Sequence, residues 1–338
     1  MPRRLLSVIV TCLIVVSIPA LLVSLVEKKP FLPPVRIQTS SELTVQVLDR
    51  KTGQVRTLPL ETYLVGVVAA EMPARFHPSA LAAQAIAART YTIKRLRQGG
   101  LPVNSGHPQA DLCTDPSHCQ ASKSDQMLLQ DWGLLHFASN YRKLSNAVES
   151  TRGLVITYQG ELIDPVYHST CGGATENSED AWVYRVPYLR SVSCPYCRNA
   201  PHYQDEYRVS WSELSSRLQI PLLVPAAAGA GKKQSQPAAA ELAALLKVES
   251  RSPTGRVKTL KVGTFSLTGA ELRSRLGLAS TRLRWQTDRQ GVTFFTQGYG
   301  HGVGLCQYGA QGLAQEGKTP AEILKYYYQG VEIQRLGN

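Results

Sequence analysis

Two helical patterns with a short break between them, ETYLVGVVAAEMPARFHPSALAAQAIAARTYTIKRLRQGG at Glu61–Gly100, decide how this chain is expected to fold. The first apolar run ends at Glu71, just before Pro73, whose ring and missing N–H stop a helix. The second run is rich in alanine, which is typical of close packing against a neighbouring element. Ser79 is its expected N-cap, and the closing Gly-Gly pair marks its end. The stretch therefore predicts two helices with Glu71 at their junction.

Strand patterns surround this pair of helices. Residues 43–60 alternate apolar and polar side chains around a Thr-Gly turn and predict a hairpin. Residues 148–169 predict two strands around Gln159-Gly160, and residues 255–269 and 281–300 are also strand-like. A capped helix is expected in TPAEILKYYYQG near the end of the chain. Helices and strands mix without regular alternation, so we expect an α+β fold with antiparallel strands.

The N-terminus predicts a membrane anchor. An uncharged run from Leu5 to Val26 is long enough to cross a bilayer, which needs about 20 apolar residues. No clean small-x-small cleavage site follows it, so an uncleaved anchor is favoured over a cleaved signal peptide. Arg3 and Arg4 favour a cytoplasmic N-terminus with the body exported.

The expected organisation follows from these patterns. Residues 1–29 form a cytoplasmic tip and transmembrane anchor, residues 30–43 a linker, and residues 44–335 the catalytic domain. A low-complexity insertion near 225–246 interrupts that domain, and its last third could be helical.

The chain is basic, with a net charge of +12 over 338 residues. This charge suits an anionic surface such as a membrane or a cell wall. No nucleic-acid motif is present, and aromatic residues are not interleaved with the lysines and arginines, so nucleic acid is not an expected partner.

Glu71 is a candidate acid. It lies at the expected C-terminal end of a helix, where the helix dipole disfavours a carboxylate. Its apolar neighbours add a desolvation cost to the charged form, and both effects raise the pKa of the carboxyl group. A raised pKa is what a general acid needs near neutral pH. The alternative is a solvent-facing glutamate on the last helical turn.

A metal-ligand pattern occurs in HPQADLCTDPSHC, where two histidines and two cysteines fall within thirteen residues. Together they make a full tetrahedral set for Zn²⁺, with no position left for water, so a structural ion is expected. The alternative is a disulfide between the two cysteines, which export permits. The four candidate ligands are His107, Cys113, His118 and Cys119.

Four further cysteines are harder to place. Cys194 and Cys197 in CPYC are a redox pair, a local disulfide, or half of a second metal site with Cys171 or Cys306. A disulfide or idle thiols are favoured over a redox enzyme, because no thioredoxin-like βαβ unit surrounds them.

Several motifs resemble one known family. EMPARFHPSALAAQAIAARTYT closely resembles the signature of the stage II sporulation protein D family, and YHSTCGGAT, GAELRSRLGL, GYGHGVGLCQYGAQGLA and EILKYYYQG match further motifs in the family's order. Together they span about Leu43 to Val331. Some family members have a pattern similar to this His/Cys pattern and bind zinc through it.

The resemblance implies a lytic transglycosylase that cleaves the bond between N-acetylmuramic acid and N-acetylglucosamine in peptide-stripped peptidoglycan, with no cofactor for catalysis. Glu71 matches the family's catalytic glutamate. The motifs carry over as substrate-binding candidates around a glycan-binding cleft: Arg89, Ser169, Thr170, His301, Gln307 and Tyr308. Many relatives have a hydroxyl residue at Cys306, so the role of this position stays open.

The resemblance also implies a setting. The enzyme would act in engulfment during sporulation, anchored in the mother-cell membrane and facing the intermembrane space. Its partners would be glycan strands, a cell-wall amidase of the stage II sporulation protein P type and a polytopic membrane protein of the stage II sporulation protein M type. Two alternatives remain: a non-catalytic glycan-binding activator of a wall amidase, and a zinc hydrolase that uses the His/Cys cluster.

Overall fold

The computed structural model describes residues 43–97, 107, 109–222 and 239–336. The expected anchor and all but the last residue of the expected linker lie outside these ranges. Within them, no helix is both long and apolar enough to cross a bilayer. Leu43–Asn338 form one compact unit.

The predicted N-terminal hairpin is confirmed. β1 (Thr44–Leu48) and β2 (Val55–Pro59) pair antiparallel, as the alternating pattern indicates. The short strand β3 (Leu112–Cys113) adds to β1 in parallel. This pairing fixes the segment that carries the predicted metal ligands against the start of the fold.

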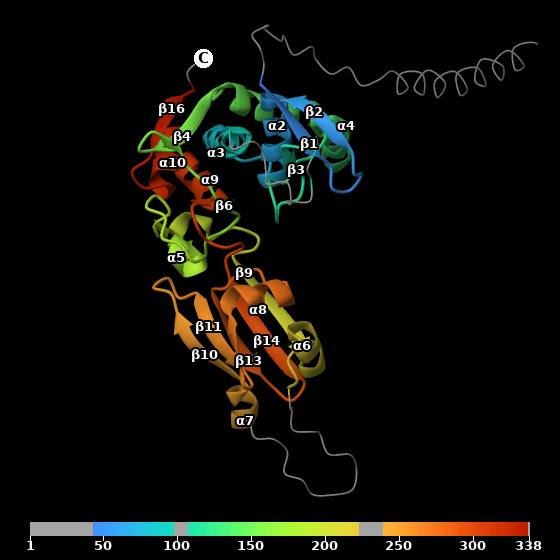
Figure 1. The fold of residues 1–338 in the computed structure, drawn as a ribbon, viewed down its shortest axis with the longest axis vertical. Helices are drawn as coiled ribbons and strands as arrows, with labels where there is room; N and C mark the ends of the chain where they lie inside the picture. Colours follow the sequence, from blue (N-terminus) through green and yellow to red (C-terminus); the bar gives the residue numbers. More distant parts are fainter. Residues whose placement is uncertain (1–42, 98–106, 108, 223–238, 337–338) are drawn as a thin grey trace, which may run out of the picture. The chain divides into compact units, whose positions relative to one another are not determined.

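Three helices pack together beside this sheet and bury the first hydrophobic core (Figure 1). They are α2 (Leu60–Glu71), α3 (Pro78–Arg97) and α4 (Asp125–Glu149). α2 ends at Glu71, as predicted.

The start of α3 differs from the prediction. The helix begins at Pro78 rather than after Ser79, because the fixed φ of proline suits the first helical position. The Nδ1 atom of His77 accepts the N–H of Ser79 at 3.2 Å. His77 therefore takes the capping role that the sequence assigned to Ser79.

The remaining elements of the first core are short, apart from one three-stranded sheet. In that sheet β4 (Leu154–Tyr158) pairs antiparallel with β5 (Glu161–Leu162) and β16 (Glu332–Arg335), and Gln159 and Gly160 make the predicted turn with positive φ. The short elements are β6 (Tyr167–His168), β7 (Gly173–Ala174), α5 (Ser178–Ala181), β8 (Ser193–Cys194), the 3-10 helix η1 (Pro195–Cys197), β15 (Leu305–Cys306), α9 (Gln307–Gln315) and α10 (Pro320–Tyr327).

A second hydrophobic core is built from residues between Tyr207 and Phe294. It lies between two antiparallel sheets and the helices packed on them. One sheet has the order β13–β14–β9, and the other β10–β11–β12. The elements are β9 (Gln204–Ser210), α6 (Trp211–Leu218), α7 (Ala239–Ala244), β10 (Leu246–Arg251), β11 (Val257–Val262), β12 (Phe265–Thr268), α8 (Gly269–Leu276), β13 (Leu283–Thr287) and β14 (Gly291–Gln297).

The α+β prediction is confirmed, since most strand pairs are antiparallel and the helices do not alternate regularly with strands. The last third of the low-complexity insertion contains α7, as expected. α10 has the predicted cap: the side chain of Thr319 accepts the N–H of Glu322, whose carboxylate accepts the N–H of Thr319 in return.

Candidate functional site

Glu71 is a partly buried carboxylic acid at the end of α2. Its Oε2 accepts a hydrogen bond from Nε2 of Gln307 at 3.0 Å. Burial raises the pKa of Glu71, while the hydrogen bonds from Gln307 and from the backbone of Ala121 offset part of that rise. The direction agrees with the expectation from the sequence, and desolvation is its largest cause.

A glycine on α2 brings the backbone of residues 121–123 close to this carboxyl. The N–H of Lys123 donates to the carbonyl of Gly66 at 3.1 Å. A Cβ added at Gly66 would lie 2.6 Å from the carbonyl oxygen of Lys123. Only glycine permits this approach, which places Ala121 beside Glu71.

Tyr167 also belongs to the surroundings of Glu71, although the sequence did not single it out. Its hydroxyl donates to Oε1 of Gln120 at 3.0 Å. Its pKa lies well above the usual value, first because of burial and second because of the negative charge of Glu71. Tyr167 directly precedes the HST stretch of the YHSTCGGAT motif. A hydroxyl-bearing aromatic residue at that position was the only hint in the motif that Tyr167 lies near the site.

Helix α9 provides one wall of the site. It begins at Gln307, and Tyr308 packs edge-to-face on Phe76 with 5.0 Å between ring centroids. Oε1 of Gln311 accepts the N–H of His77 at 2.6 Å. The loop that follows Glu71 is therefore held against α9, and the first and last family motifs meet here.

Ser169 and Thr170 lie in the loop that follows β6. Their hydroxyls lie 3.2 Å apart, and the carbonyl of Ser169 accepts the N–H of Tyr308 at 3.1 Å. Thr170 has no exposed surface and pairs with Tyr299 in a β-bridge. The direct sugar contact expected for Thr170 is therefore not available in this conformation, whereas Ser169 is partly exposed.

His301 is held by the protein through both ring nitrogens. Nε2 donates to the carbonyl of Tyr167 at 3.0 Å, and Nδ1 accepts the N–H of Val303 at 3.1 Å. Burial lowers its pKa to about 4, so the ring is neutral near pH 7. Its expected sugar contact would have to use the ring face or edge.

Trp182 is a further candidate that the sequence did not reveal. Its ring centroid lies 5.2 Å from that of His301, and the residue is 44% exposed. The next two residues, Val183 and Tyr184, are even more exposed. Flat aromatic faces of this kind suit contact with sugar rings, yet the sequence around Trp182 carries no spacing signal that relates it to His301.

Arg89 occupies a different place from the one expected. Its side chain is completely buried, and it forms a two-pronged ion pair with Glu61 at 3.0 and 2.6 Å. The remaining donors reach the side chain of Thr151 and the carbonyls of Val148 and Leu154. A direct role toward glycan or Glu71 is excluded in this conformation, because all the donors of the guanidinium bind protein groups. Arg89 instead joins α2, α3, α4 and β4.

The four predicted metal ligands do come together. Their ligand atoms all lie within 4.8 Å of one another. Nδ1 of His118 lies 3.2 Å from Nε2 of His107 and 3.6 and 3.5 Å from the Sγ atoms of Cys113 and Cys119. Neither of these two cysteines is in a disulfide.

The chemistry of this donor set fits zinc. Nδ1 of His107 lies 3.0 Å from the carbonyl of Ala110, which leaves Nε2 free to bind a metal when Nδ1 carries the proton. Two imidazoles and two thiolates complete a tetrahedron. Gln120 and Ala121 follow Cys119 directly, so an ion here would fix the segment that reaches Glu71.

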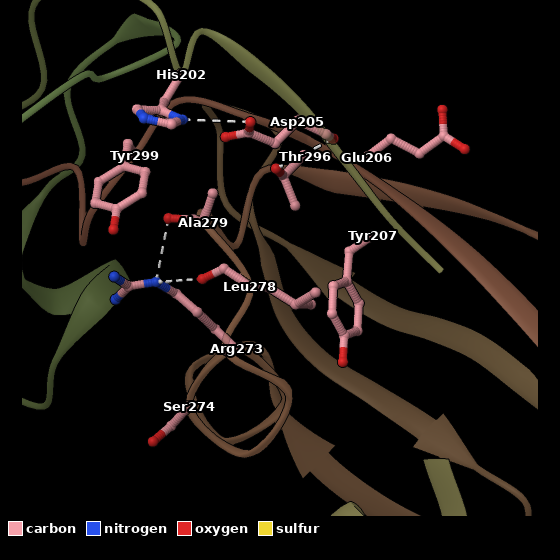
Figure 2. A pocket seen from close by; sticks show the side chains of 11 residues that line it. His202, Asp205, Glu206, Tyr207, Arg273, Ser274, Leu278, Ala279, Thr296 and Tyr299 are labelled. Atoms are coloured by element: carbon pink, nitrogen blue, oxygen red, sulfur yellow. Dashed lines mark hydrogen bonds and ion pairs between the residues drawn. The ribbon is translucent and has the colours of Figure 1, made fainter. Parts of the chain in front are cut away.

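A pocket of about 550 Å³ lies in the second half of the chain, between β9 and α8 (Figure 2). Arg273 donates from Nε to the carbonyls of Leu278 and Ala279 on its wall, and Tyr299 lies at its rim. None of the predicted site residues lines it. A smaller pocket of about 200 Å³ is lined by Ala70 and Ala121, and the charged residues around it are Asp49, Lys51, Arg56 and Lys123.

The fold and site together define a class: an α+β protein in which separate sequence motifs converge on one partly buried carboxyl. A family model described as stage II sporulation protein matches residues 49–158. Stage II sporulation protein D of Bacillus subtilis is 35% identical over 308 residues, or 91% of this chain and 84% of the relative. Its counterpart in Bacillus amyloliquefaciens is 35% identical, covering 87% of this chain and 79% of the relative.

The chain belongs to the stage II sporulation protein D family. A more distant relative carries a different name. The amidase enhancer of Bacillus subtilis is 28% identical over 80% of this chain, which covers 40% of that protein.

Proposed function

We propose that this protein is a lytic transglycosylase that cleaves peptide-stripped peptidoglycan strands, with Glu71 as its acid and base. The observation that carries the proposal is the environment of Glu71: a carboxyl at a helix end, with a pKa raised by burial and one oxygen held by Gln307. A protonated carboxyl near neutral pH is the requirement for protonating a glycosidic oxygen.

One carboxyl is enough for this reaction. Neutral Glu71 donates its proton to the oxygen between N-acetylmuramic acid and N-acetylglucosamine, and the C1–O bond breaks. The substrate's acetamido group stabilises the positive charge that develops at C1, where most glycosidases use a second carboxylate. Ionised Glu71 then accepts the proton of the C6 hydroxyl, whose oxygen closes on C1. The product carries a 1,6-anhydro ring, and no water is consumed.

The surroundings suit such a substrate. The hydrogen bond from Gln307 favours the ionised carboxylate that forms halfway through the reaction. Lys51 and Arg56 place positive charge around the small pocket next to Ala70 and Ala121, which Asp49 also lines. Lys123 lines the pocket too, and its Nζ pairs with Asp131 at 2.7 Å. A muramic acid without its peptide bears a lactyl carboxylate, which this charge complements.

The test is mass spectrometry of the products that residues 43–338 release from peptide-free glycan strands. Wild type should release fragments with 1,6-anhydro ends. Glu71→Gln keeps the size and the contact with Gln307 but has no transferable proton, so the anhydro ends should disappear. Glu161→Gln changes an exposed carboxylate on β5 and should leave the products unchanged.

A second candidate function is activation of a wall amidase without cleavage. The relative named amidase enhancer favours it. In this case Glu71→Gln would stimulate a purified amidase as well as wild type does, and neither protein would produce anhydro ends. Anhydro ends from wild type alone, with equal glycan binding by both proteins, would instead support the transglycosylase.

We further propose a structural Zn²⁺ at His107, Cys113, His118 and Cys119. Four protein ligands leave no position for a catalytic water. The ion would hold the segment from Cys119 to Ala121 against Glu71 and take no part in proton transfer. Cleavage that persists after metal removal would therefore separate this enzyme from a zinc hydrolase.

The setting is also a proposal. Residues 1–29 would anchor the protein in the mother-cell membrane, with the domain facing the intermembrane space, and a wall amidase and a polytopic membrane protein would be its partners. The basic net charge suits an acidic wall or membrane surface. Recovery of the full chain in the membrane fraction after an alkaline wash would support the anchor, and its release would refute it.

A further inference from the structure

Four cysteines from distant parts of the sequence meet in the first core. Cys171 precedes β7, Cys194 ends β8, Cys197 lies in η1 and Cys306 ends β15. All four are fully buried, and their Sγ atoms lie within 4.8 Å of one another. The sequence alone does not decide between a redox pair, a disulfide and a metal site for Cys194 and Cys197. The structure places Cys171 and Cys306 beside them.

The sulfur atoms are too far apart for disulfides. Sγ of Cys171 lies 3.4 Å from Sγ of Cys197, whereas a disulfide bond is about 2.05 Å long. All four cysteines are unpaired. In a tetrahedral zinc site with Zn–S bonds of about 2.3 Å, neighbouring sulfurs lie about 3.8 Å apart. The observed grouping therefore has the size of a shell around a single ion.

Backbone N–H groups point at these sulfurs. The N–H groups of Cys171 and Gly309 both donate to Sγ of Cys306 at 3.3 Å, and the N–H of Gly173 donates to Sγ of Cys171 at 3.4 Å. Such donors stabilise thiolates and orient them on a metal. The bond from Gly309 also caps the start of α9, whereas the bonds from Cys171 and Gly173 lie outside any helix.

We propose that Cys171, Cys194, Cys197 and Cys306 bind one zinc ion. Four thiolates fill a tetrahedral shell, so the site is closed and structural. The short Cys194–Cys197 spacing across η1 supplies two ligands from one turn. A cluster of several irons would hold its thiolates on different metal atoms and would need them farther apart. This inference does not depend on the proposed glycan cleavage.

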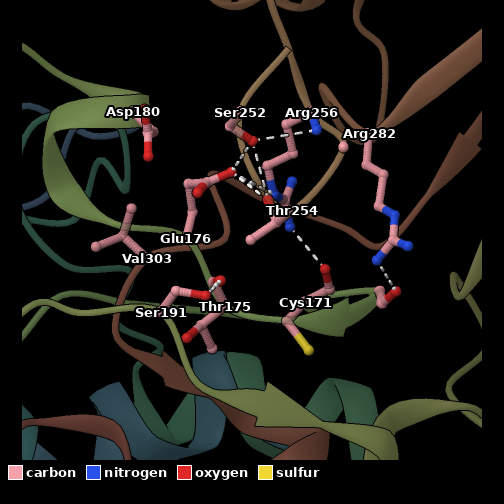
Figure 3. Close-up of polar contacts among 12 residues, drawn as sticks. Cys171, Thr175, Glu176, Asp180, Ser191, Ser252, Thr254, Arg256, Arg282 and Val303 are labelled. Carbon is pink, nitrogen blue, oxygen red and sulfur yellow. Dashed lines mark hydrogen bonds and ion pairs between the residues drawn. The ribbon is translucent and has the colours of Figure 1, made fainter.

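The site joins the two cores of the molecule. Nη2 of Arg256, a buried residue next to β11, donates to the carbonyl of Cys171 at 2.6 Å (Figure 3). Nη1 of Arg282 donates to the carbonyl of Gly172 at 2.6 Å. The cysteine loop is thus fixed from the second core while the sulfurs sit in the first.

The site also supports Glu71 indirectly. Cys306 directly precedes Gln307, which donates to Glu71. A metal bound to Cys306 would fix the start of α9 and with it the direction of the Gln307 side chain. The ion would act as a positioning element for the carboxyl.

The test measures metal content of the full chain, purified without chelator, by elemental analysis. Wild type should hold about two zinc ions per chain, one in each Cys-containing site. Cys197→Ser and Cys113→Ser should each hold about one, and the double variant about none. Cys12→Ser, outside both sites, should match wild type.

X-ray absorption at the zinc edge of Cys113→Ser gives an independent reading, because that variant keeps all four cysteines of the proposed site. A shell of sulfur alone at about 2.3 Å supports the proposal. Nitrogen or oxygen in the shell, or no zinc in this variant, overturns it. Resistance of these cysteines to alkylation in denaturant, reversed by a reductant, would show disulfides and would also overturn it.

Discussion

Gln307 donates a hydrogen bond to the carboxyl of Glu71 at 3.0 Å across 236 positions of sequence. The bond ties the start of α9 to the end of α2. It favours the ionised form of a carboxyl whose burial favours the neutral form. These opposed influences, together with the hydrogen bond from the backbone of Ala121, set the proton affinity of the proposed acid.

Replacing Gln307 with alanine should shift the pH profile of glycan cleavage. The substitution removes a hydrogen bond that lowers the pKa of Glu71, so this pKa should rise further. The carboxyl group then stays protonated to higher pH, so the alkaline limb of the kcat/KM profile should shift to higher pH. Because the carboxylate is also less well positioned, kcat should fall by about 10-fold to 100-fold.

The control for this prediction is Gln315→Ala, an exposed residue on the same helix, which should leave both quantities unchanged. An unshifted or downward-shifted alkaline limb in Gln307→Ala would show that this hydrogen bond does not tune the acid.

Arg89 should be required for folding rather than for binding. Arg89→Met leaves the carboxylate of Glu61 buried without its partner and should lower the free energy of unfolding by about 3–5 kcal/mol. Denaturant unfolding measures it. The double variant Arg89→Met/Glu61→Leu should recover much of that loss, because no charge is left unpaired.

Arg75→Met, at an exposed arginine, provides the matched control and should unfold like wild type. If the Arg89 variant kept wild-type stability but lost glycan binding, the role of Arg89 in the ligand site would have to be restored.

Loss of the His/Cys site should loosen the segment beside Glu71. Cys113→Ser should lose about one zinc ion per chain and lower the thermal unfolding midpoint, because metal binding contributes to folding free energy. Cleavage should slow without stopping, since the proposed ion would take no part in proton transfer. Elemental analysis and calorimetry measure the first two effects, with the exposed His136→Ala as control. Unchanged zinc content would refute the site.

Stability should fall in mild acid partly because of His301. Burial lowers its pKa from 6.5 to about 4. Between these values the unfolded chain binds a proton that the folded chain does not, so the folded state loses stability as pH falls from about 6.5 to about 4. His301→Gln should show a weaker decline in thermal midpoint over this range than wild type. His202→Gln, at an exposed histidine, should decline as wild type does, and equal slopes in all three proteins would contradict the assignment.

Much of the local structure could be predicted because its signals are local. Alternation around Thr-Gly gave the first hairpin, Pro73 ended the helix near Glu71, and Thr319 with Glu322 capped α10. Each depends on backbone geometry or on contacts within a few residues. The one local error, the cap of α3, arose where the side chain of His77 replaced the expected serine.

The positions of several functional side chains in the fold could not be predicted from the sequence. Arg89 has the sequence context of a ligand-binding arginine, yet it is buried against Glu61 on a different helix. Trp182 meets His301 only because α5 lies near the last glycine-rich motif. Neither relation leaves a periodic or spaced signal in the sequence.

The sequence by itself determined the α+β class, the position of Glu71 at a helix end, and the first group of candidate metal ligands, which lie within thirteen residues. These depend on hydrophobic period, proline and short spacing, which act along the chain. Only the tertiary structure decided that Gln307 holds Glu71, that Arg89 is internal, and that four separate cysteines share one point. Such contacts join residues far apart in sequence, and the packing of whole elements selects them.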